Sequence, residues 1–302
     1  MINKIIWIIK ISFIFFSIFF FLNIDFSKLN FFNYNQLIAI LVLIIFHLFR
    51  ILRFYIIFYF LNNKINFFRL VEIYYIGLYL GIITPGRLGE FYRIKLINDL
   101  NIPNLSNYNF LLIEKITDIF SLICFIFLLL ITGFYTLNLQ TIFLFFTFVL
   151  VGIFFIKNGY YFFTYFTKKI ICFFPKLKKK KFFELFFKNN PFVNLGNKKL
   201  IFLFLLTMTI WLIFIFAVHI GINGNFKVNF LETIKLFVIN TFVTALPITI
   251  MGIGLREIVL TEIFQINNLS YLANISFQFI FVNIISALPG FILFFNKEYK
   301  LK

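Results

Sequence analysis

Apolar residues run along the chain in long segments, and polar positions between them fall in short clusters. A helix that crosses a bilayer needs about 20 apolar residues, because it rises about 1.5 Å per residue through a hydrocarbon core of about 30 Å. The predicted full spans are roughly 5–23, 36–60, 111–133, 139–156, 200–221 and 270–295. This pattern predicts an all-α polytopic membrane protein.

Two further apolar segments are too short for this task. Leu70–Thr84 stops at Pro85, and Leu236–Ile250 contains Pro247. Each would reach only about 22 Å as a helix. Each is therefore either a re-entrant segment, which turns back inside the membrane, or an unusually short span.

The charge of the loops distinguishes these two topologies, because lysine and arginine concentrate in cytoplasmic loops. The loop 157–199 holds eleven lysines against one acidic residue, and the tail "NKEYKLK" is also basic. With eight spanning helices, the basic segments 85–110 and 157–199 would lie outside. With six spans and two re-entrant segments, every strongly basic segment lies on one side. We therefore predict the second topology, with both termini in the cytoplasm.

This topology gives the two halves of the chain the same order of elements in opposite orientation. Residues 1–134 read as span, span, re-entrant segment and span, and residues 135–302 repeat that order. Many transporters are built from such inverted repeats, with interrupted helices around the substrate. The sequence predicts one transmembrane domain over 1–302.

Composition agrees with a membrane protein and narrows the partners. Mean hydropathy is +0.99 and 13% of residues are charged, about half the usual share. The net charge of +17 gathers in loops, so we expect the basic loop 157–199 to meet an anionic lipid leaflet and expect no nucleic-acid partner. Cys124 and Cys172 suggest neither a disulfide nor a metal site, and no cofactor is expected.

Both interrupted segments end in clusters of charge. Arg87, Glu90 and Arg93 follow the first, in "ITPGRLGEFYRIKL", and Arg256 and Glu257 follow the second, in "ALPITIMGIGLREIVL". Irregular backbone and ionisable groups survive at membrane depth only inside protein or beside a wet cavity, which makes them candidate binding residues. The turns themselves are predicted at Pro85, Gly86, Gly89, Pro247, Gly252 and Gly254.

A third charged set lies at the start of a predicted span. Glu114 and Asp118 are four residues apart, so they share one helix face. We expect them to face the bundle interior and pair with Arg87 or Arg93. Arginine is scarce beside lysine in this chain, and guanidinium matches phosphate or carboxylate bidentately, so the arginines hint at an oxyanion partner. The alternative is that these pairs only staple the hairpins into the bundle.

The second predicted span carries His47, Arg50 and Arg53 at intervals of three, on one broad helix face. We expect the two arginines to extend along the helix to the membrane interface. His47 is expected to pack between helices or lie at the interface rather than act as a ligand.

Three segments together resemble a known family. The segments "TPGRLGEFYR" (84–93), "IEKITDIFSL" (113–122) and "LPITIMGIGLREIVL" (246–260) resemble the signature segments of the lysylphosphatidylglycerol synthase transmembrane region family, also called flippase-like domain proteins. The resemblance covers about 10–295, with Lys115 standing where arginine is expected. It implies a membrane domain that handles or translocates lipid. The synthase half seen in two-domain relatives does not follow here, so we do not expect aminoacylation.

The function predicted first is a flippase or transporter-like protein of a prokaryotic cytoplasmic membrane. The substrate-binding residues would be Arg87, Glu90, Arg93, Glu114, Asp118, Arg256 and Glu257. The lipid would carry an anionic or phosphate-containing head group, and no ATPase motif is found. Two alternatives stay open: a membrane enzyme acting on lipid-linked phosphates or sugars, and an accessory subunit of a partner enzyme. A homo-oligomer is also compatible with the sequence.

Overall fold

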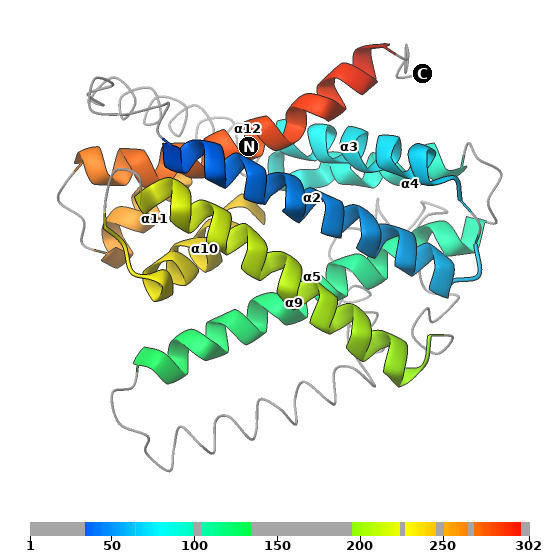
Figure 1. The fold of residues 1–302 in the computed structure, drawn as a ribbon, viewed down its shortest axis with the longest axis horizontal. Helices are drawn as coiled ribbons and strands as arrows, with labels where there is room; N and C mark the ends of the chain where they lie inside the picture. The colour runs from blue at the N-terminus through cyan, green and yellow to red at the C-terminus, as the bar shows by residue number, and fades with distance from the viewer. Residues whose placement is uncertain are drawn as a thin grey trace, which may run out of the picture. The chain divides into compact units, whose positions relative to one another are not determined.

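The computed structural model describes residues 34–63, 65–98, 104–133, 195–223, 227–245, 251–264 and 269–296. Within these ranges every regular element is a helix (Figure 1). In chain order they are α2 (Tyr34–Phe60), α3 (Phe67–Ile83), the 3₁₀ helix η2 (Pro85–Phe91), α4 (Tyr92–Asn98), α5 (Asn104–Gly133), α9 (Gly196–Asn223), α10 (Phe230–Ala245), α11 (Leu255–Phe264) and α12 (Leu269–Asn296).

Four described helices are long and apolar enough to cross a membrane. Their candidate spans are Tyr34–Phe60 in α2, Phe110–Thr132 in α5, Lys198–Asn223 in α9 and Ile275–Asn296 in α12. These helices confirm four predicted spans, with ends close to the predicted positions. The predicted spans 5–23 and 139–156 lie outside the described residues. The all-α membrane fold is confirmed.

Helix α2 turns polar side chains inward and apolar side chains outward. His47, Arg50 and Arg53 are buried. Its exposed large apolar residues follow one face at intervals of three or four positions, with two of them adjacent: Tyr34, Leu37, Leu41, Ile44, Ile45, Leu48, Leu52, Tyr55 and Tyr59. In a water-soluble protein the exposed stripe would be polar. The reversed pattern suits a helix whose outer face contacts lipid.

Helix α3 and the elements that follow it form a helical hairpin. A Cβ atom on Gly77 would lie 2.2 Å from Arg93 Nε, and one on Gly81 would lie 2.5 Å from Glu90 Cγ. Later positions on the second arm thus meet earlier positions on α3, so the chain reverses direction near Pro85. The 17 residues of α3 rise only about 25 Å, which is short of the hydrocarbon core.

Helices α10 and α11 form a second hairpin of the same kind. Arg256 Nη1 donates a hydrogen bond of 3.3 Å to Asn240 Oδ1. A Cβ atom on Gly252 would lie 3.1 Å from Thr244 Cγ2. These contacts pair α11 and the turn before it with the last two turns of α10. Pro247, the predicted break, lies outside the described residues.

Helix α12 contacts the first hairpin at a glycine. A Cβ atom on Gly290 would lie only 2.0 Å from the carbonyl oxygen of Tyr75 in α3. Only a residue without a side chain permits this backbone approach. Gly290 follows Pro289, which lies inside the helix. The polar residues Asn283 and Ser286 lie within the two turns before that proline.

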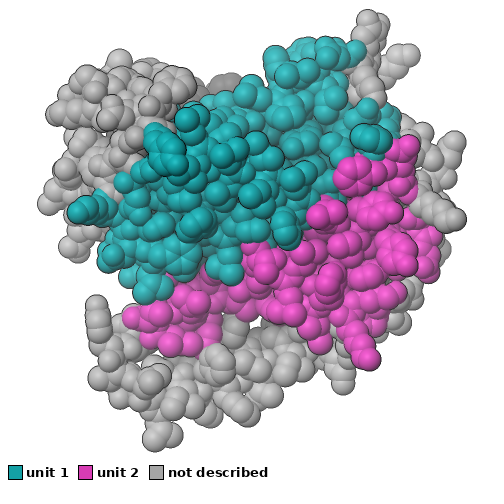
Figure 2. Space-filling model, viewed as in Figure 1, with its two compact units in different colours: residues 1–51, 68–93, 210–302 teal, residues 52–67, 94–209 magenta. Residues whose placement is uncertain are grey.

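The chain divides into two compact units (Figure 2). Unit 1 comprises 1–51, 68–93 and 210–302, and unit 2 comprises 52–67 and 94–209. Unit 1 contains α3, η2 and α10 to α12, whereas α5 lies in unit 2, and α2 and α9 contribute to both. Both units therefore draw on both predicted repeats. The repeat boundary near 134 and the single domain over 1–302 stay predictions.

Candidate functional site

The first interrupted segment ends in a turn with strained backbone. Gly86 and Arg87 have φ angles of 62° and 56°, in the left-handed region. This region is costly for a residue with a Cβ atom, and such strain clusters at functional sites. Thr84 Oγ1 accepts a 2.6 Å hydrogen bond from the Gly89 N–H and donates a 2.8 Å bond to the Leu80 carbonyl. The threonine thus joins the turn to the end of α3.

Two charged residues after the turn are buried against α3. Glu90 and Arg93 are 2% and 0% exposed, and they occupy the space left by the absent side chains of Gly81 and Gly77. The Arg93 guanidinium lies 5.3 Å from the ring centre of Tyr74, within cation–π range. Both residues therefore hold the two arms of the first hairpin together.

Arg87 is more exposed than the charged residues Glu90 and Arg93 that follow it. Its side chain is 32% exposed, and its Nη1 lies 4.0 Å from Glu90 Oε1. Arg87, Glu90 and Arg93 recur every three residues, which would place them on one face of a regular helix. The non-helical backbone at Gly86 and Arg87 separates Arg87 from that face.

The second turn contains three residues with positive φ: Met251 at 55°, Gly252 at 76° and Gly254 at 85°. Glu257 then closes the start of α11, because its Oε2 accepts a 2.6 Å hydrogen bond from the Gly254 N–H. This is the acidic half of a capping box, in which the third helical residue reaches back to the residue that caps the helix.

Arg256 and Glu257 form a buried ion pair, 2.9 Å between Nη2 and Oε1. Their side chains are 0% and 1% exposed. Ser276 of α12 contacts both partners, accepting from Arg256 Nη2 at 2.6 Å and donating to Glu257 Oε1. With the bond to Asn240, this network ties α10, α11 and α12 together inside unit 1.

The two turns line one pocket in unit 1. It is a small, partly open pocket with room for about one water molecule; its lining residues are Gly81, Ile82, Thr84, Arg87, Thr244, Met251 and Asn283. Helix α10 contacts η2 directly, which brings the two turns together. Arg87 and Met251, the strained non-glycine residues of the two turns, both line it. Among the predicted binding residues, only Arg87 is part of this lining.

A second polar group in unit 1 surrounds His47. Its Nδ1 hydrogen-bonds with the Tyr74 hydroxyl at 2.8 Å and its Nε2 with Ser286 Oγ at 2.7 Å. The imidazole therefore joins α2, α3 and α12, which confirms the predicted packing role. Arg50 lies 5.6 Å from the ring centre of Tyr74 and 5.9 Å from that of Trp211.

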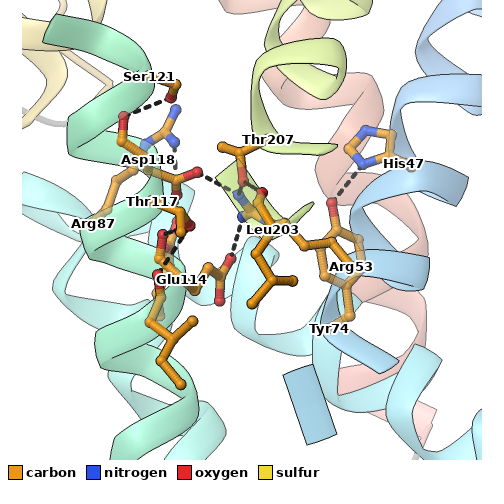
Figure 3. A network of polar contacts seen from close by, with 12 residues as sticks. His47, Arg53, Tyr74, Arg87, Glu114, Thr117, Asp118, Ser121, Leu203 and Thr207 are labelled. Atoms are coloured by element: carbon orange, nitrogen blue, oxygen red, sulfur yellow. Dashed lines mark hydrogen bonds and ion pairs between the residues drawn. The ribbon is translucent and has the colours of Figure 1, made fainter. Parts of the chain in front are cut away.

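The two carboxylates of α5 belong to a cluster in unit 2 (Figure 3). Arg53 Nη1 donates to Asp118 Oδ1 at 2.6 Å and to Thr207 Oγ1 at 3.0 Å, while its Nη2 donates to Glu114 Oε1 at 3.2 Å. The cluster therefore joins α2, α5 and α9. The pairing of Glu114 or Asp118 with Arg87 or Arg93 stays a prediction.

The expectation that Arg50 and Arg53 extend to the membrane interface is wrong. Both side chains are buried, at 5% and 1% exposed. Arg53 is held by two carboxylates and a threonine, and Arg50 lies among aromatic rings. An arginine in a membrane helix stays inside protein when such partners are available there.

Several residues of the pocket and of the Arg53 cluster were not predicted from the sequence. Thr84, Thr244, Met251 and Asn283 line the pocket, and Arg53 is the cation of the unit 2 cluster. A signal existed for Asn283, because asparagine, serine and a Pro-Gly pair interrupt the apolar run "VNIISALPG". Within the described residues, no group of three histidine, cysteine or acidic side chains could hold a metal ion.

Comparison with known proteins gives one match. The model of the family "Lysylphosphatidylglycerol synthase TM region" matches residues 7–290. Searches among curated proteins and solved structures found no match. The family match covers most of the chain and includes both interrupted segments with their charged turns. This multi-pass membrane protein therefore belongs to the lysylphosphatidylglycerol synthase TM region family, which links it to the handling of lipids.

Proposed function

We propose that this protein binds a lipid with an anionic or phosphate-containing head group and moves it across the membrane. The observation that carries the proposal is the pocket lined by both interrupted turns, with the partly exposed guanidinium of Arg87 in its wall. Interrupted helices that meet around a polar site are the arrangement by which many transporters bind their substrates.

The three arginines of the turns then have different roles. Arg87 is accessible and can form two parallel hydrogen bonds to a phosphate. Arg93 and Arg256 are fully buried, and a head group would reach them only after the surrounding residues moved apart. We therefore assign head-group contact to Arg87. The other two, with Glu90 and Glu257, hold the hairpins that form the pocket.

The pocket is far too small to enclose a whole lipid. Its volume of about 10 Å³ holds about one water molecule and is far below the range of about 300–1,000 Å³ typical of sites that enclose a complete small molecule. The acyl chains would stay outside, along apolar side chains such as Leu88, which is exposed in η2.

The topology follows from the same proposal. The two hairpins would be re-entrant segments, and the basic segments would face the cytoplasm of a prokaryotic cell, with both termini on that side. The basic loop 157–199 would bind the anionic leaflet. A partner enzyme or a second copy could bind the protein in the same membrane.

The experiment is a translocation assay in sealed proteoliposomes that contain a fluorescent phosphatidylglycerol, an aminoacylated lipid or a polyprenyl phosphate. We expect the wild-type protein to move at least one of these lipids, and Arg87→Gln to slow that movement at least tenfold. Arg69→Gln is the matched control, because Arg69 lies on the same hairpin with a similar exposed fraction and pairs with Glu72 outside the pocket.

Two results would contradict the proposal. The first is folded wild-type protein that moves no lipid, which would favour the accessory or enzyme alternatives. The second is equal loss in the Arg87 and Arg69 variants, which would reduce Arg87 to a general structural role.

A further inference from the structure

Three polar side chains of the pocket orient their hydrogen-bonding groups in the same way. Thr84 and Thr244 donate their hydroxyl hydrogens to the carbonyls of Leu80 and Asn240, each at 2.8 Å. Asn283 Nδ2 donates to the Phe279 carbonyl, also at 2.8 Å. In each case the acceptor carbonyl lies four residues earlier in the chain, so each threonine hydroxyl hydrogen and one of the two Asn283 Nδ2 hydrogens are bonded locally.

The two threonines therefore offer only oxygen acceptors to the pocket, and Asn283 offers its amide oxygen beside one remaining N–H. A hydroxyl has two acceptor sites besides its one donor, and an amide oxygen accepts without donating. Within the described part of the chain, the amide oxygen of Asn283 has no hydrogen-bond partner, although the residue is only 8% exposed. Among the described lining residues, the wall thus combines one cation, Arg87, with three acceptor oxygens, of which Thr84 Oγ1 already accepts one bond from the Gly89 N–H.

Asn283 is the most informative of the three. Threonine commonly donates to the preceding turn in a membrane helix, so Thr84 and Thr244 need no ligand to explain them. An asparagine in an apolar span is costly unless both ends of its amide are satisfied. One N–H of its amide is bonded to the Phe279 carbonyl within α12, and its oxygen is left for a molecule in the pocket.

The charges around the pocket add a second condition. Arg87 lies 4.0 Å from the buried carboxylate of Glu90, so the guanidinium is partly neutralised before any ligand arrives. Among the described lining residues Arg87 is the one cation, so a second anionic charge on the ligand would have no cation to contact there. A phosphodiester with one negative charge suits the site better than a phosphate monoester with two.

We propose that Asn283 determines specificity by requiring a head group that carries N–H or O–H donors beside its phosphate. This inference rests on the proposed function, because it takes the pocket as the head-group site. The phosphate would contact Arg87. An ammonium or hydroxyl group, joined to the phosphate by a short carbon linker, would donate to Asn283 Oδ1, and the hydroxyl oxygens of Thr244 and Thr84 would be further acceptors. A trimethylated ammonium offers no donor and is disfavoured.

The test uses four lipids with identical acyl chains: phosphatidylethanolamine and its N-methyl, N,N-dimethyl and N,N,N-trimethyl (choline) derivatives. The phosphate and the positive charge are kept along this series, while the number of N–H donors falls stepwise to none. Binding to the purified full-length protein is measured by native mass spectrometry. We expect affinity to fall along the series, by about tenfold in all, as for the loss of one charge-assisted hydrogen bond. Phosphatidylglycerol, with O–H donors, should bind better than the choline lipid.

Variants separate selectivity from folding. Asn283→Leu keeps the branched shape of the side chain without the amide oxygen and should bind the four lipids equally. Asn283→Asp keeps acceptor oxygens and should retain the preference for donor-bearing lipids, which a purely structural role would not predict. Thr244→Val provides a second test if the leucine variant does not fold, and it should weaken the preference. Arg87→Gln should lower binding of all four lipids and leave their ratio unchanged.

The inference is overturned if the wild-type protein binds the four lipids equally or binds none, or if Asn283→Leu keeps the preference. Failure of the proposed function is a separate outcome. A preserved affinity series with no translocation of any lipid would refute transport and leave the specificity of the pocket standing.

Discussion

At the residue scale, glycines decide where charged side chains are accommodated. Gly77 and Gly81 are four residues apart on α3, and their missing side chains make room for Arg93 and Glu90. Gly89 lets the second arm approach the backbone of α3, because a Cβ atom there would lie 2.1 Å from the carbonyl oxygen of Leu80. The first hairpin is therefore packed backbone to backbone at its tip and side chain to backbone along its arms.

We expect Gly89→Ala to destabilise the protein strongly. Its Cβ would meet backbone, which cannot swing aside as a flexible side chain can, so the cost should reach the upper range for overpacking, about 3 kcal/mol. Gly196→Ala is the control. Gly196 has a φ of 71° and nothing within 4 Å, so alanine there costs only backbone strain, about 1–2 kcal/mol. Unfolding midpoints in detergent would measure both, and equal losses would contradict the packing explanation.

Residue types and spacings predicted where both charged turns lie. They did not predict the role of each charged residue in them. Arg87, Glu90 and Arg93 recur every three residues, a spacing that indicates a common helix face. Which of them is accessible depends on the positive φ at Arg87 and on the space beside Gly77 and Gly81. Neither feature follows from local spacing, because both depend on how the second arm lies against α3.

At the element scale, the second hairpin is held by a charge pair that the sequence analysis assigned to substrate binding. Arg256 and Glu257 are buried and joined to Asn240, Ser276 and the Gly254 N–H. These contacts are sufficient to explain both residues as a staple between α10, α11 and α12. A substrate-binding role stays a prediction, and stability measurements can separate the two roles.

We expect Arg256→Met and Glu257→Gln to be more harmful separately than together. Each single change leaves one unpaired buried charge, which costs about 3–5 kcal/mol, whereas the double change removes both charges. Glutamine also keeps an oxygen for the Gly254 N–H. Thermal unfolding of the four combinations would give the coupling energy, and translocation by the double variant should persist.

The partly exposed pair Arg69–Glu72 provides the control, because Arg69→Met and Glu72→Gln should change stability by less than about 1 kcal/mol, alone or together. A double variant of Arg256 and Glu257 that folds normally yet moves no lipid would instead assign these two residues to the substrate, as the sequence analysis predicted.

At the scale of the whole molecule, hydropathy predicted the long helices well and the internal clusters poorly. Lengths of apolar sequence located α2, α5, α9 and α12, because crossing a membrane is a constraint that each helix meets by itself. The pocket and the Arg53 cluster each combine residues far apart in the chain, such as Arg87 with Asn283, or Arg53 with Thr207. No local pattern specifies such pairings.

The last prediction concerns topology. A re-entrant hairpin leaves the segments before and after it on the same side of the membrane, whereas a short span places them on opposite sides. In a cysteine-free background (Cys124→Ser, Cys172→Ser), single cysteines would replace Asn66 before α3, Lys95 after the first turn and Thr136 in the loop 134–138. Asn66 and Lys95 are exposed. A membrane-impermeant maleimide would then be applied to sealed right-side-out and inside-out vesicles.

If the first hairpin is re-entrant, the cysteines at positions 66 and 95 lie on one side of the membrane and the cysteine at position 136 on the other. The first two should react only in inside-out vesicles, because the flanking lysines and arginines favour the cytoplasm. An eight-helix protein would place positions 66 and 95 on opposite sides. If these two cysteines are labelled from opposite sides, the first hairpin is not re-entrant. The predicted topology of six spans and two re-entrant segments is then excluded.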